Sequence, residues 1–277
     1  MSDSVTRLAG ESRAPHASGL HVRDLTVRFG GLIAVDSATL HAPEGQITGL
    51  IGPNGAGKTT IFNACTGLVK PTHGEITLRG RDVHHAPPQA RARLGLGRTF
   101  QRMELFDSLT VWDNVAMGRE GVKAGNRPWR HLVSSRGVAS EVREATAEAL
   151  ALCGIEALAN RRPADLSTGQ RRLVELARVA AGDFHVLLLD EPSSGLDHRE
   201  SERFGAILTS LVATRGVAIL LVEHDVALVM TVCDYVYVLD FGRMIFEGTT
   251  AAVATSPEVR AAYLGTSEEA SAVGIGA

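Results

Sequence analysis

A glycine-rich loop, Gly52–Thr60, constrains this chain more than any other stretch. Its sequence, GPNGAGKTT, matches the phosphate-binding loop pattern G-x-x-x-x-G-K-[ST] at every required position. The apolar run 46–51 before it predicts a buried strand, and residues 59–68 after it predict a helix that ends near Gly67. This order of strand, loop and helix directs backbone N–H groups and a helix N-terminus at a bound phosphate. The stretch therefore predicts a nucleoside triphosphate site in an α/β fold.

Each part of the loop has an expected role in holding the phosphates. The glycines lack side chains that would keep backbone N–H groups away from a triphosphate. Lys58 places a positive charge near the β- and γ-phosphates, and the Thr59 hydroxyl is a potential ligand of Mg²⁺. The predicted nucleotide-binding residues of the loop are Gly52, Pro53, Asn54, Gly55, Ala56, Gly57, Lys58, Thr59 and Thr60.

The composition is that of an ordinary globular protein, with 277 residues of which 44% are apolar and 21% charged. This length suits one large α/β domain or two smaller ones. The net charge of −3 gives no reason to expect a nucleic-acid partner, and we expect the arginine-rich stretches 91–98 and 161–172 to be solvated helix faces. The three cysteines lie far apart without metal-ligand spacing, which predicts reduced, buried thiols in a cytosolic protein.

The two ends of the chain differ from its middle. Residues 1–19 predict a disordered leader without the apolar core of a signal peptide, and residues 266–277 predict a flexible tail. No apolar run approaches the roughly 20 residues that span a bilayer. We therefore expect a domain at 20–265 that neither crosses a membrane nor is exported by the signal-peptide route.

Two further apolar runs end in polar residues. Residues 184–189 lead into Asp190 and Glu191, and residues 217–222 lead into His224. Because parallel strands bind ligands at their carboxyl ends, we expect these side chains to meet beside the phosphate loop. Asp190 is expected to hold Mg²⁺, Glu191 to activate a water molecule, and His224 to contact the γ-phosphate.

Three other candidates for the nucleotide site also have a purely structural interpretation. Phe29, at a predicted strand end, either stacks on a base or belongs to the core. Gln101 reaches Mg²⁺ or the attacking water, or else it faces solvent. The turn 166–170 before a predicted helix is either a second phosphate-binding end or a simple N-cap.

The remaining pattern outlines the architecture. Residues 21–29 predict a strand, residues 32–40 predict either a partner strand or a turn, and 235–247 predicts a terminal hairpin. The region 87–163 is predicted to be mostly helical, with no evident central strand. Within it, residues 118–140 read as an irregular insertion, either a solvated loop or a docking element for another subunit.

Together, these motifs resemble those of the ATP-binding subunits of ABC transporters, from about Leu20 to Gly265. The ordered set comprises the phosphate loop, Gln101, the signature Leu166-Ser167-Thr168-Gly169-Gln170, the pair Asp190-Glu191, the turn Ser194-Gly195-Leu196-Asp197, and His224. Thr168 stands where the family usually has a glycine. The resemblance implies an α/β P-loop NTPase with a mixed or parallel sheet core, an antiparallel β subdomain, and a helical subdomain inserted at about 87–163.

The resemblance also implies roles for the site residues. Phe29 would stack on adenine, and Gln101 would sense both Mg²⁺ and the transporter's coupling helix. Glu191 would be the catalytic carboxylate and His224 the switch residue. Ser167 and Gly169 would touch ATP bound by the opposite protomer, which implies a head-to-tail dimer held together by ATP. The predicted nucleotide-binding set also includes Gln170 and Asp197.

Within this family, three stretches look like the branched-chain amino-acid importer ATPases. They are residues 91–101, the insertion 118–140 and the ending 259–265. Urea importer and lipopolysaccharide export ATPases look similar, and the loop 98–101 favours the amino-acid branch. The expected partners are membrane permease subunits, a second ATP-binding subunit that is identical or related, and indirectly a solute-binding protein, with the chain peripheral on the inner face of the cell membrane.

Two classes outside transport fit less well. DNA-repair and chromosome-structure ATPases of the same superfamily need long heptad segments between the phosphate loop and the signature, and this intervening segment is short and irregular. Ribosome-associated factors usually join two ATP cassettes, whereas this sequence has one phosphate loop.

Overall fold

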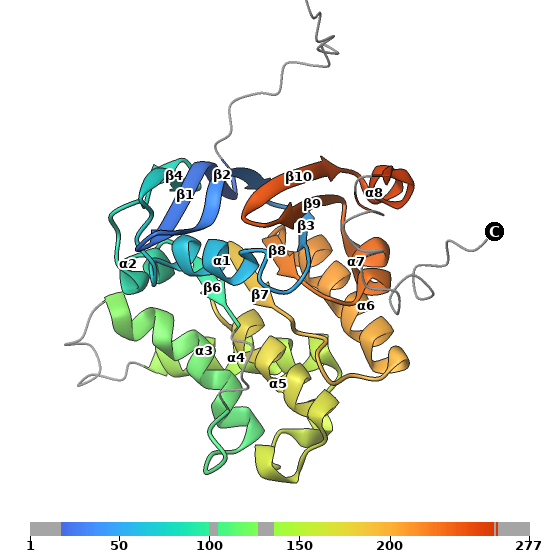
Figure 1. Ribbon diagram of the computed structural model, residues 1–277. Helices are drawn as coiled ribbons and strands as arrows, with labels where there is room; N and C mark the ends of the chain where they lie inside the picture. The colour runs from blue at the N-terminus through green and yellow to red at the C-terminus, as the bar shows by residue number, and fades with distance from the viewer. Residues whose placement is uncertain (1–17, 100–104, 127–135, 258, 260–277) are drawn as a thin grey trace, which may run out of the picture.

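A computed structural model describes residues 18–99, 105–126, 136–257 and 259, and within them the chain forms two sheets and a set of helices (Figure 1). The smaller sheet is antiparallel, in the order β2-β1-β4-β5. Its strands are β1 (Leu20–Phe29), β2 (Leu32–Ala42), β4 (His73–Leu78) and β5 (Arg81–Asp82). The strand predicted at 21–29 is therefore confirmed, and the stretch 32–40 is its partner strand and not a turn.

The larger sheet has the order β10-β9-β3-β8-β7-β6 and is parallel except for β10. Its strands are β3 (Ile47–Ile51), β6 (Leu96–Arg98), β7 (Val186–Asp190), β8 (Ala218–Val222), β9 (Tyr235–Asp240) and β10 (Arg243–Gly248). Every residue of β3, β7 and β8 is buried, as the continuous apolar runs predict for strands covered on both faces. The terminal hairpin is β9–β10.

Helices pack around the larger sheet. They are α1 (Lys58–Thr66), α2 (Pro88–Arg93), α3 (Val111–Asn126), α4 (Arg136–Cys153), α5 (Thr168–Ala181), α6 (His198–Arg215), α7 (Val226–Val232) and α8 (Thr250–Thr255), with 3₁₀ turns η2 (Glu156–Leu158) and η3 (Pro163–Asp165). In Figure 1, α3, α4 and α5 gather at the opposite end of the molecule from β1, β2 and β4.

The larger sheet separates two hydrophobic cores. On β7, Leu187 and Leu189 belong to a core shared with α5, α6 and α7, whereas Val186 and Leu188 face a core shared with α1 and the antiparallel sheet. Successive strand residues point to opposite faces, so this alternation fills both cores from one strand. The sheet is thus the middle layer, and the carboxyl ends of its strands are fixed by packing on both sides.

The predicted irregular insertion at 118–140 is wrong for the described part of that stretch. Helix α3 continues to Asn126 and α4 begins at Arg136, while residues 127–135 lie outside the described residues. Gly118 begins the stretch that was expected to be irregular, but a Cβ there would lie 1.8 Å from the carbonyl oxygen of Arg178 on α5. The glycine lets α3 and α5 approach closely instead of ending a helix.

The region 87–163 also contains β6, a short edge strand parallel to β7. We expected no central strand there, and β6 lies at the edge of the sheet. The region thus has helix α2 before this strand and helices α3 and α4 after it. The predicted leader and tail lie outside the described residues except for Ser18 and Gly19.

The arginine-rich stretches are not uniformly solvated, which corrects the expectation from charge patterning. Arg93, Arg161 and Arg162 are exposed, but Arg91 and Arg172 are buried. A buried guanidinium needs acceptors, which a sequence does not reveal because they come from distant segments.

Arg91 has four such acceptors. Its guanidinium donates to the carbonyl oxygens of Ala64 and Cys65, each at 2.7 Å, and to those of Ala86 at 2.9 Å and His84 at 3.2 Å. The first two carbonyls end α1, the helix that follows the phosphate loop, so Arg91 caps the C-terminus of that helix.

The sequence also led us to expect buried, reduced thiols and no segment that crosses a membrane. Cys65, Cys153 and Cys233 are all buried and unbridged, as predicted. Among the helices of the described segments, none combines the length and the apolar character needed to cross a bilayer.

Candidate active site

The phosphate loop runs from the end of β3 to the start of α1. A Cβ at Gly52 would lie 2.1 Å from the carbonyl oxygen of Leu239, and one at Gly57 would lie 2.6 Å from that of Ala34. Gly57 also has a φ of 107°, which side-chain-bearing residues rarely adopt. Glycine is therefore required at both positions, because the loop packs directly against β2 and β9.

Lys58, the first residue of α1, is held against the loop that precedes it. Its side chain is 5% exposed, and Nζ donates to the carbonyl oxygens of Gly52 at 2.6 Å and Pro53 at 3.0 Å. Burial lowers the pKa of Lys58, and the carboxylates of Glu191 and Asp190 counteract that shift. The ammonium is thus a fixed positive charge enclosed by the loop.

A cleft of about 510 Å³ opens over the loop. Seven consecutive loop and helix residues, 54–60, form one side of it together with Glu191. The other side is apolar and consists of Phe29, Leu32, Ile33, Ala34, Phe241 and Gly242. A polar floor beside an apolar wall suits a ligand with a phosphate chain and a flat base.

Phe241 was missed by the sequence reasoning. It lies in the turn between β9 and β10, has a φ of 41°, and leaves 89% of its side chain exposed at the cleft. The neighbouring Gly242 donates its N–H to the carbonyl oxygen of Ala56 at 2.9 Å, which attaches this turn to the phosphate loop. Phe29, predicted to stack on a base or to be core, is 51% exposed and lines the same cleft.

Asp190, at the end of β7, is 2% exposed and forms an ion pair with Arg98 at 3.1 Å. Burial raises the pKa of Asp190, and the charges of Arg98 and Lys58 partly offset that effect. Arg98 also donates to Asn63 Oδ1 at 2.7 Å and Thr66 Oγ1 at 3.2 Å on α1. Arg98 therefore connects the phosphate-loop helix to the acidic strand end, a link that the sequence reasoning did not anticipate.

Glu191 and His224 are brought together, as predicted from the strand ends. His224 Nε2 lies 2.5 Å from Glu191 Oε1. Glu191 has a φ of 47°, and its N–H donates to the carbonyl oxygen of Val222 at 2.9 Å. A positive φ at a non-glycine residue is strained and is concentrated at functional sites, where the surroundings impose it.

The signature segment forms a helix N-terminus. Ser167 is the N-cap of α5: its Oγ accepts from Gln170 N at 3.2 Å, and Gln170 Oε1 accepts from Ser167 N at 3.1 Å. Asp197 caps α6 in the same way through Glu200. A Cβ at Gly169 would lie 2.2 Å from Glu200 Oε1, so the two helix ends touch.

These signature residues do not line the 510 Å³ cleft. Nine of the predicted site residues therefore line the cleft, namely Phe29, Glu191 and the seven residues 54–60. His224 joins them through its contact with Glu191. The signature residues lie outside the cleft. Gln101 lies outside the described residues.

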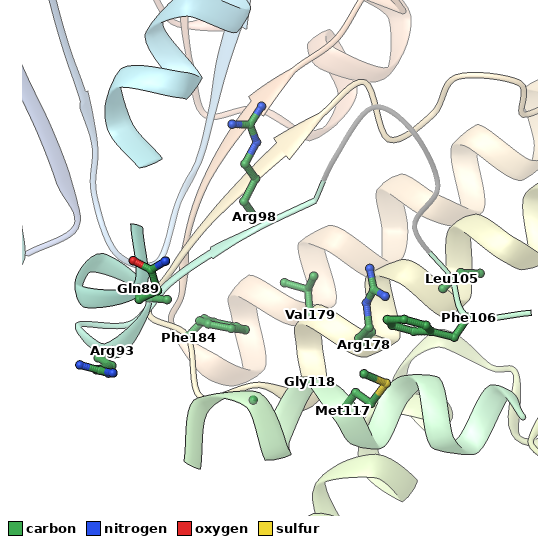
Figure 2. A pocket seen from close by; sticks show the side chains of 12 residues that line it. Gln89, Arg93, Arg98, Leu105, Phe106, Met117, Gly118, Arg178, Val179 and Phe184 are labelled. Carbon is green, nitrogen blue, oxygen red and sulfur yellow. The ribbon is translucent and has the colours of Figure 1, made fainter. Parts of the chain in front are cut away.

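A second hollow of about 740 Å³ lies between β6, α2, α3 and α5 (Figure 2). Phe106 and Met117 line it and are 48% and 36% exposed. In Figure 2 both lie close to Arg178 of α5, while Arg93 of α2 lies on the opposite side. This hollow therefore combines apolar side chains with basic ones.

The donors at the cleft suit Mg²⁺. Among the described residues, no group of three His, Cys, Asp or Glu side chains converges as a metal cage. Mg²⁺ does not need one, since it usually binds through one or two protein oxygens together with substrate phosphates and water. The hydroxyl of Thr59, an exposed residue, and the carboxylate of Asp190, the last residue of β7, are donors of that kind.

Comparison with known proteins identifies this arrangement. The family model described as ABC transporter matches residues 35–194, more than half of the chain. The chain is an ABC transporter ATP-binding protein. A second model, Branched-chain amino acid ATP-binding cassette transporter, matches residues 243–269.

Relatives span nearly the whole of this ABC protein. It is 40% identical over 250 residues to the high-affinity branched-chain amino acid transport ATP-binding protein LivG of Salmonella typhimurium, covering 89% of this chain and 97% of the relative. It is 37% identical over 257 residues to BraF of Pseudomonas aeruginosa, a protein with the same description, with the same coverage. The sulfate/thiosulfate import ATP-binding protein CysA of Mycobacterium bovis is 38% identical over 85% of this chain and 63% of the relative.

Solved structures agree with the fold. The ADP conformation of MJ1267, an ATP-binding cassette of an ABC transporter, has a TM-score of 0.78 at 27% identity, over 90% of this chain and 99% of that one. The predicted P-loop ABC fold is confirmed, and the protein is an ATPase of the transport-coupled class. ATP-binding subunits of ABC importers act with membrane permeases and dimerise, and a solved relative is a dimer with ADP and phosphate bound.

Proposed function

We propose that this protein hydrolyses ATP to energise the import of branched-chain amino acids through a membrane permease. The observation that carries the proposal is the match of residues 243–269 to the model for branched-chain amino-acid cassettes. The relatives LivG and BraF support the same solute class, and they favour it over amide import and lipopolysaccharide export.

The cleft provides the binding steps. Backbone N–H groups of the loop and the ammonium of Lys58 bind the phosphates of ATP, and the apolar wall with Phe29 and Phe241 binds the adenine. Thr59 and Asp190 hold Mg²⁺, which when bound neutralises charge on the β- and γ-phosphates.

Glu191 provides the proton-transfer step. Its carboxylate, 16% exposed, orients the attacking water and accepts a proton from it as the bond between the γ-phosphorus and ADP breaks. His224 donates to the Glu191 carboxylate, which keeps that side chain in one orientation, and contacts the γ-phosphate. The products are ADP and inorganic phosphate. Gln101, just beyond β6, senses the metal and the permease.

The signature residues act on a second subunit. The N-terminus of α5, with Ser167, Gly169 and Gln170, binds the γ-phosphate of ATP held by the partner, and Asp197 lies beside it through the α5–α6 contact. This pairing is head-to-tail, with an identical or a related ATP-binding subunit. Dimeric structures of other cassettes support it.

The 740 Å³ hollow receives the permease. Its occupant is a short cytoplasmic segment of the permease with apolar side chains against Phe106 and Met117 and acidic ones near Arg93 and Arg178. This contact places the protein on the inner face of the cell membrane. A solute-binding protein acts on the permease from the other side.

The test is transport by a reconstituted complex. The chain, its permease and a solute-binding protein are placed in proteoliposomes, and ATP-dependent uptake of leucine and of urea is measured together with phosphate release. We expect leucine uptake, and its loss together with phosphate release in Glu191→Gln. The exposed Glu202→Gln on α6 is the matched control and should keep both activities.

Two outcomes contradict separate parts of the proposal. Near-normal phosphate release by Glu191→Gln removes Glu191 from the hydrolytic mechanism. Uptake of urea without leucine leaves the ATPase assignment in place and overturns the solute class.

A further inference from the structure

Glu223 is a buried carboxylate at the active site to which no role has been given. It is the first residue after β8 and is 3% exposed. Oε1 accepts from the backbone N–H of Ser193 at 2.7 Å, and Oε2 accepts from that of His224 at 3.2 Å. Burial raises the pKa of Glu223, and the nearby donors of Ser193, His224 and Asp225 partly offset that shift. A charge at this depth is costly unless several donors satisfy it, and here they do.

These donors come from two different loops. Ser193 is two residues after Glu191, in the loop that follows β7, whereas His224 and Asp225 belong to the loop that follows β8. The strands β7 and β8 pair up to Asp190 and Val222. The Glu223 carboxylate therefore links the two loops just beyond the point where the sheet ladder ends.

The two loops that Glu223 links carry Glu191 and His224. Glu191 lies two positions before Ser193, and the backbone N–H groups of Ser193 and His224 both donate to Glu223. The side chains of Glu191 and His224 meet with Oε1 and Nε2 2.5 Å apart. Glutamate is suited to the link because both of its oxygens are acceptors. Glutamine has one acceptor oxygen, and its amide NH₂ would face an N–H donor at the other position.

We propose that Glu223 is a positioning residue that holds the Glu191 loop and the His224 loop at the separation needed for ATP hydrolysis. The inference rests on the hydrolytic roles proposed above for Glu191 and His224. Glu223 does not line the nucleotide cleft, so it acts on turnover and not on nucleotide binding.

The test measures kcat and KM for ATP in Glu223→Gln of the full-length protein assembled with its permease. We expect kcat to fall by about 10- to 100-fold, since a displacement of the order of 1 Å at a catalytic group has effects of that size. The KM and the affinity for a fluorescent ATP analogue should stay within about twofold. A merely structural carboxylate would lower the melting temperature without this split between kcat and KM.

Glu175→Gln is the matched control. Glu175 is also 3% exposed, and it pairs with Arg172 at 3.0 Å on α5. We expect this variant to lose stability and keep kcat within about twofold. Equal losses of kcat in the two variants, or a normal kcat in Glu223→Gln, would overturn the inference.

Two further variants, Glu223→Asp and Glu191→Gln, distinguish a folding defect and a wrong hydrolytic mechanism from a failure of this inference. Glu223→Asp keeps the charge and shortens the reach, so it should fold even where the glutamine variant does not, with a smaller loss of kcat. A normal kcat in Glu223→Asp together with an unchanged melting temperature contradicts the inference. If Glu191→Gln retains turnover, the hydrolytic role proposed for Glu191 fails and this inference fails with it. If only the Glu223 variants retain turnover, the inference alone is wrong.

Discussion

Replacing Arg91 by Met tests whether the phosphate-loop helix depends on the arginine that caps it. Arg91 is 1% exposed, and two of its four acceptors, the carbonyl oxygens of Ala64 and Cys65, are fully buried at the end of α1. Methionine fills most of the same space but donates no hydrogen bond. The substitution therefore leaves the Cys65 carbonyl without its donor, whereas the Ala64 carbonyl keeps the backbone N–H of Gly67 at 3.1 Å.

The expected magnitude follows from these contacts. Each buried acceptor left unsatisfied costs about 1–3 kcal/mol, while the part-buried acceptors of Ala86 and His84 can turn to water. Burial lowers the pKa of Arg91, so removing the charge also removes a desolvation cost that offsets part of the loss. We expect a net loss of about 2 kcal/mol in the free energy of unfolding, and a melting temperature lower by about 4–8 °C.

The assay is thermal unfolding followed by circular dichroism, with Arg93→Met as the control. Arg93 lies two residues further along the same helix and is exposed, so its variant should stay within about 0.5 kcal/mol of the parent. Arg91→Lys should lie between the two, because an ammonium reaches fewer of the four carbonyls. A loss below about 1 kcal/mol for Arg91→Met, or equal losses for both methionine variants, would refute the capping role.

Three further predictions concern the cleft and the thiols. Phe241→Ala should weaken binding of a fluorescent ATP analogue by about 2- to 10-fold, the value of one aromatic contact; an unchanged affinity would exclude Phe241 from the base site. Gly57→Ala, whose Cβ would lie 2.6 Å from a carbonyl oxygen, should abolish the thermal shift that ATP produces, and a retained shift would contradict the close packing of the loop. Burial raises the pKa of Cys65 and Cys153 to about 12, so neither thiol should react with a thiol reagent at pH 8 before unfolding. The same raised pKa, above the usual thiol value of 9.0, means that both thiols contribute stability below about pH 9 that is lost as the pH rises towards 12. A flat alkaline unfolding profile would contradict this.

The sequence predicts those parts of the site that depend on short segments. The strand, loop and helix around Gly52–Thr60 are contiguous, and their spacing alone indicates how the backbone must run. The meeting of Glu191 and His224 also follows from a local pattern, because both residues end apolar strands of one parallel sheet.

The contacts that the sequence did not predict join segments far apart in the chain. Arg98 pairs with Asp190 across 92 positions, and Gly118 touches α5 across 60. Charge patterning treats an arginine by its neighbours in sequence, so it predicted solvated side chains where buried acceptors lie. Phe241 was overlooked for the same reason, since an aromatic in a hairpin turn has no pattern that connects it to a loop at residues 52–60.

The order of strands in the larger sheet has a consequence for synthesis. The strand that ends in the phosphate loop, β3, has β8 on one side and β9 on the other, and both come from residues 218–240. A ribosome that has made the first 200 residues has produced a complete phosphate loop but neither strand that flanks β3. Parallel pairing over such a separation is slow, because a long loop must close before any contact forms. The nascent chain must therefore keep β3, whose residues are all buried in the folded protein, from aggregating until the last quarter of the protein emerges. The interval before ATP can first bind is thus also an interval in which chaperones are needed.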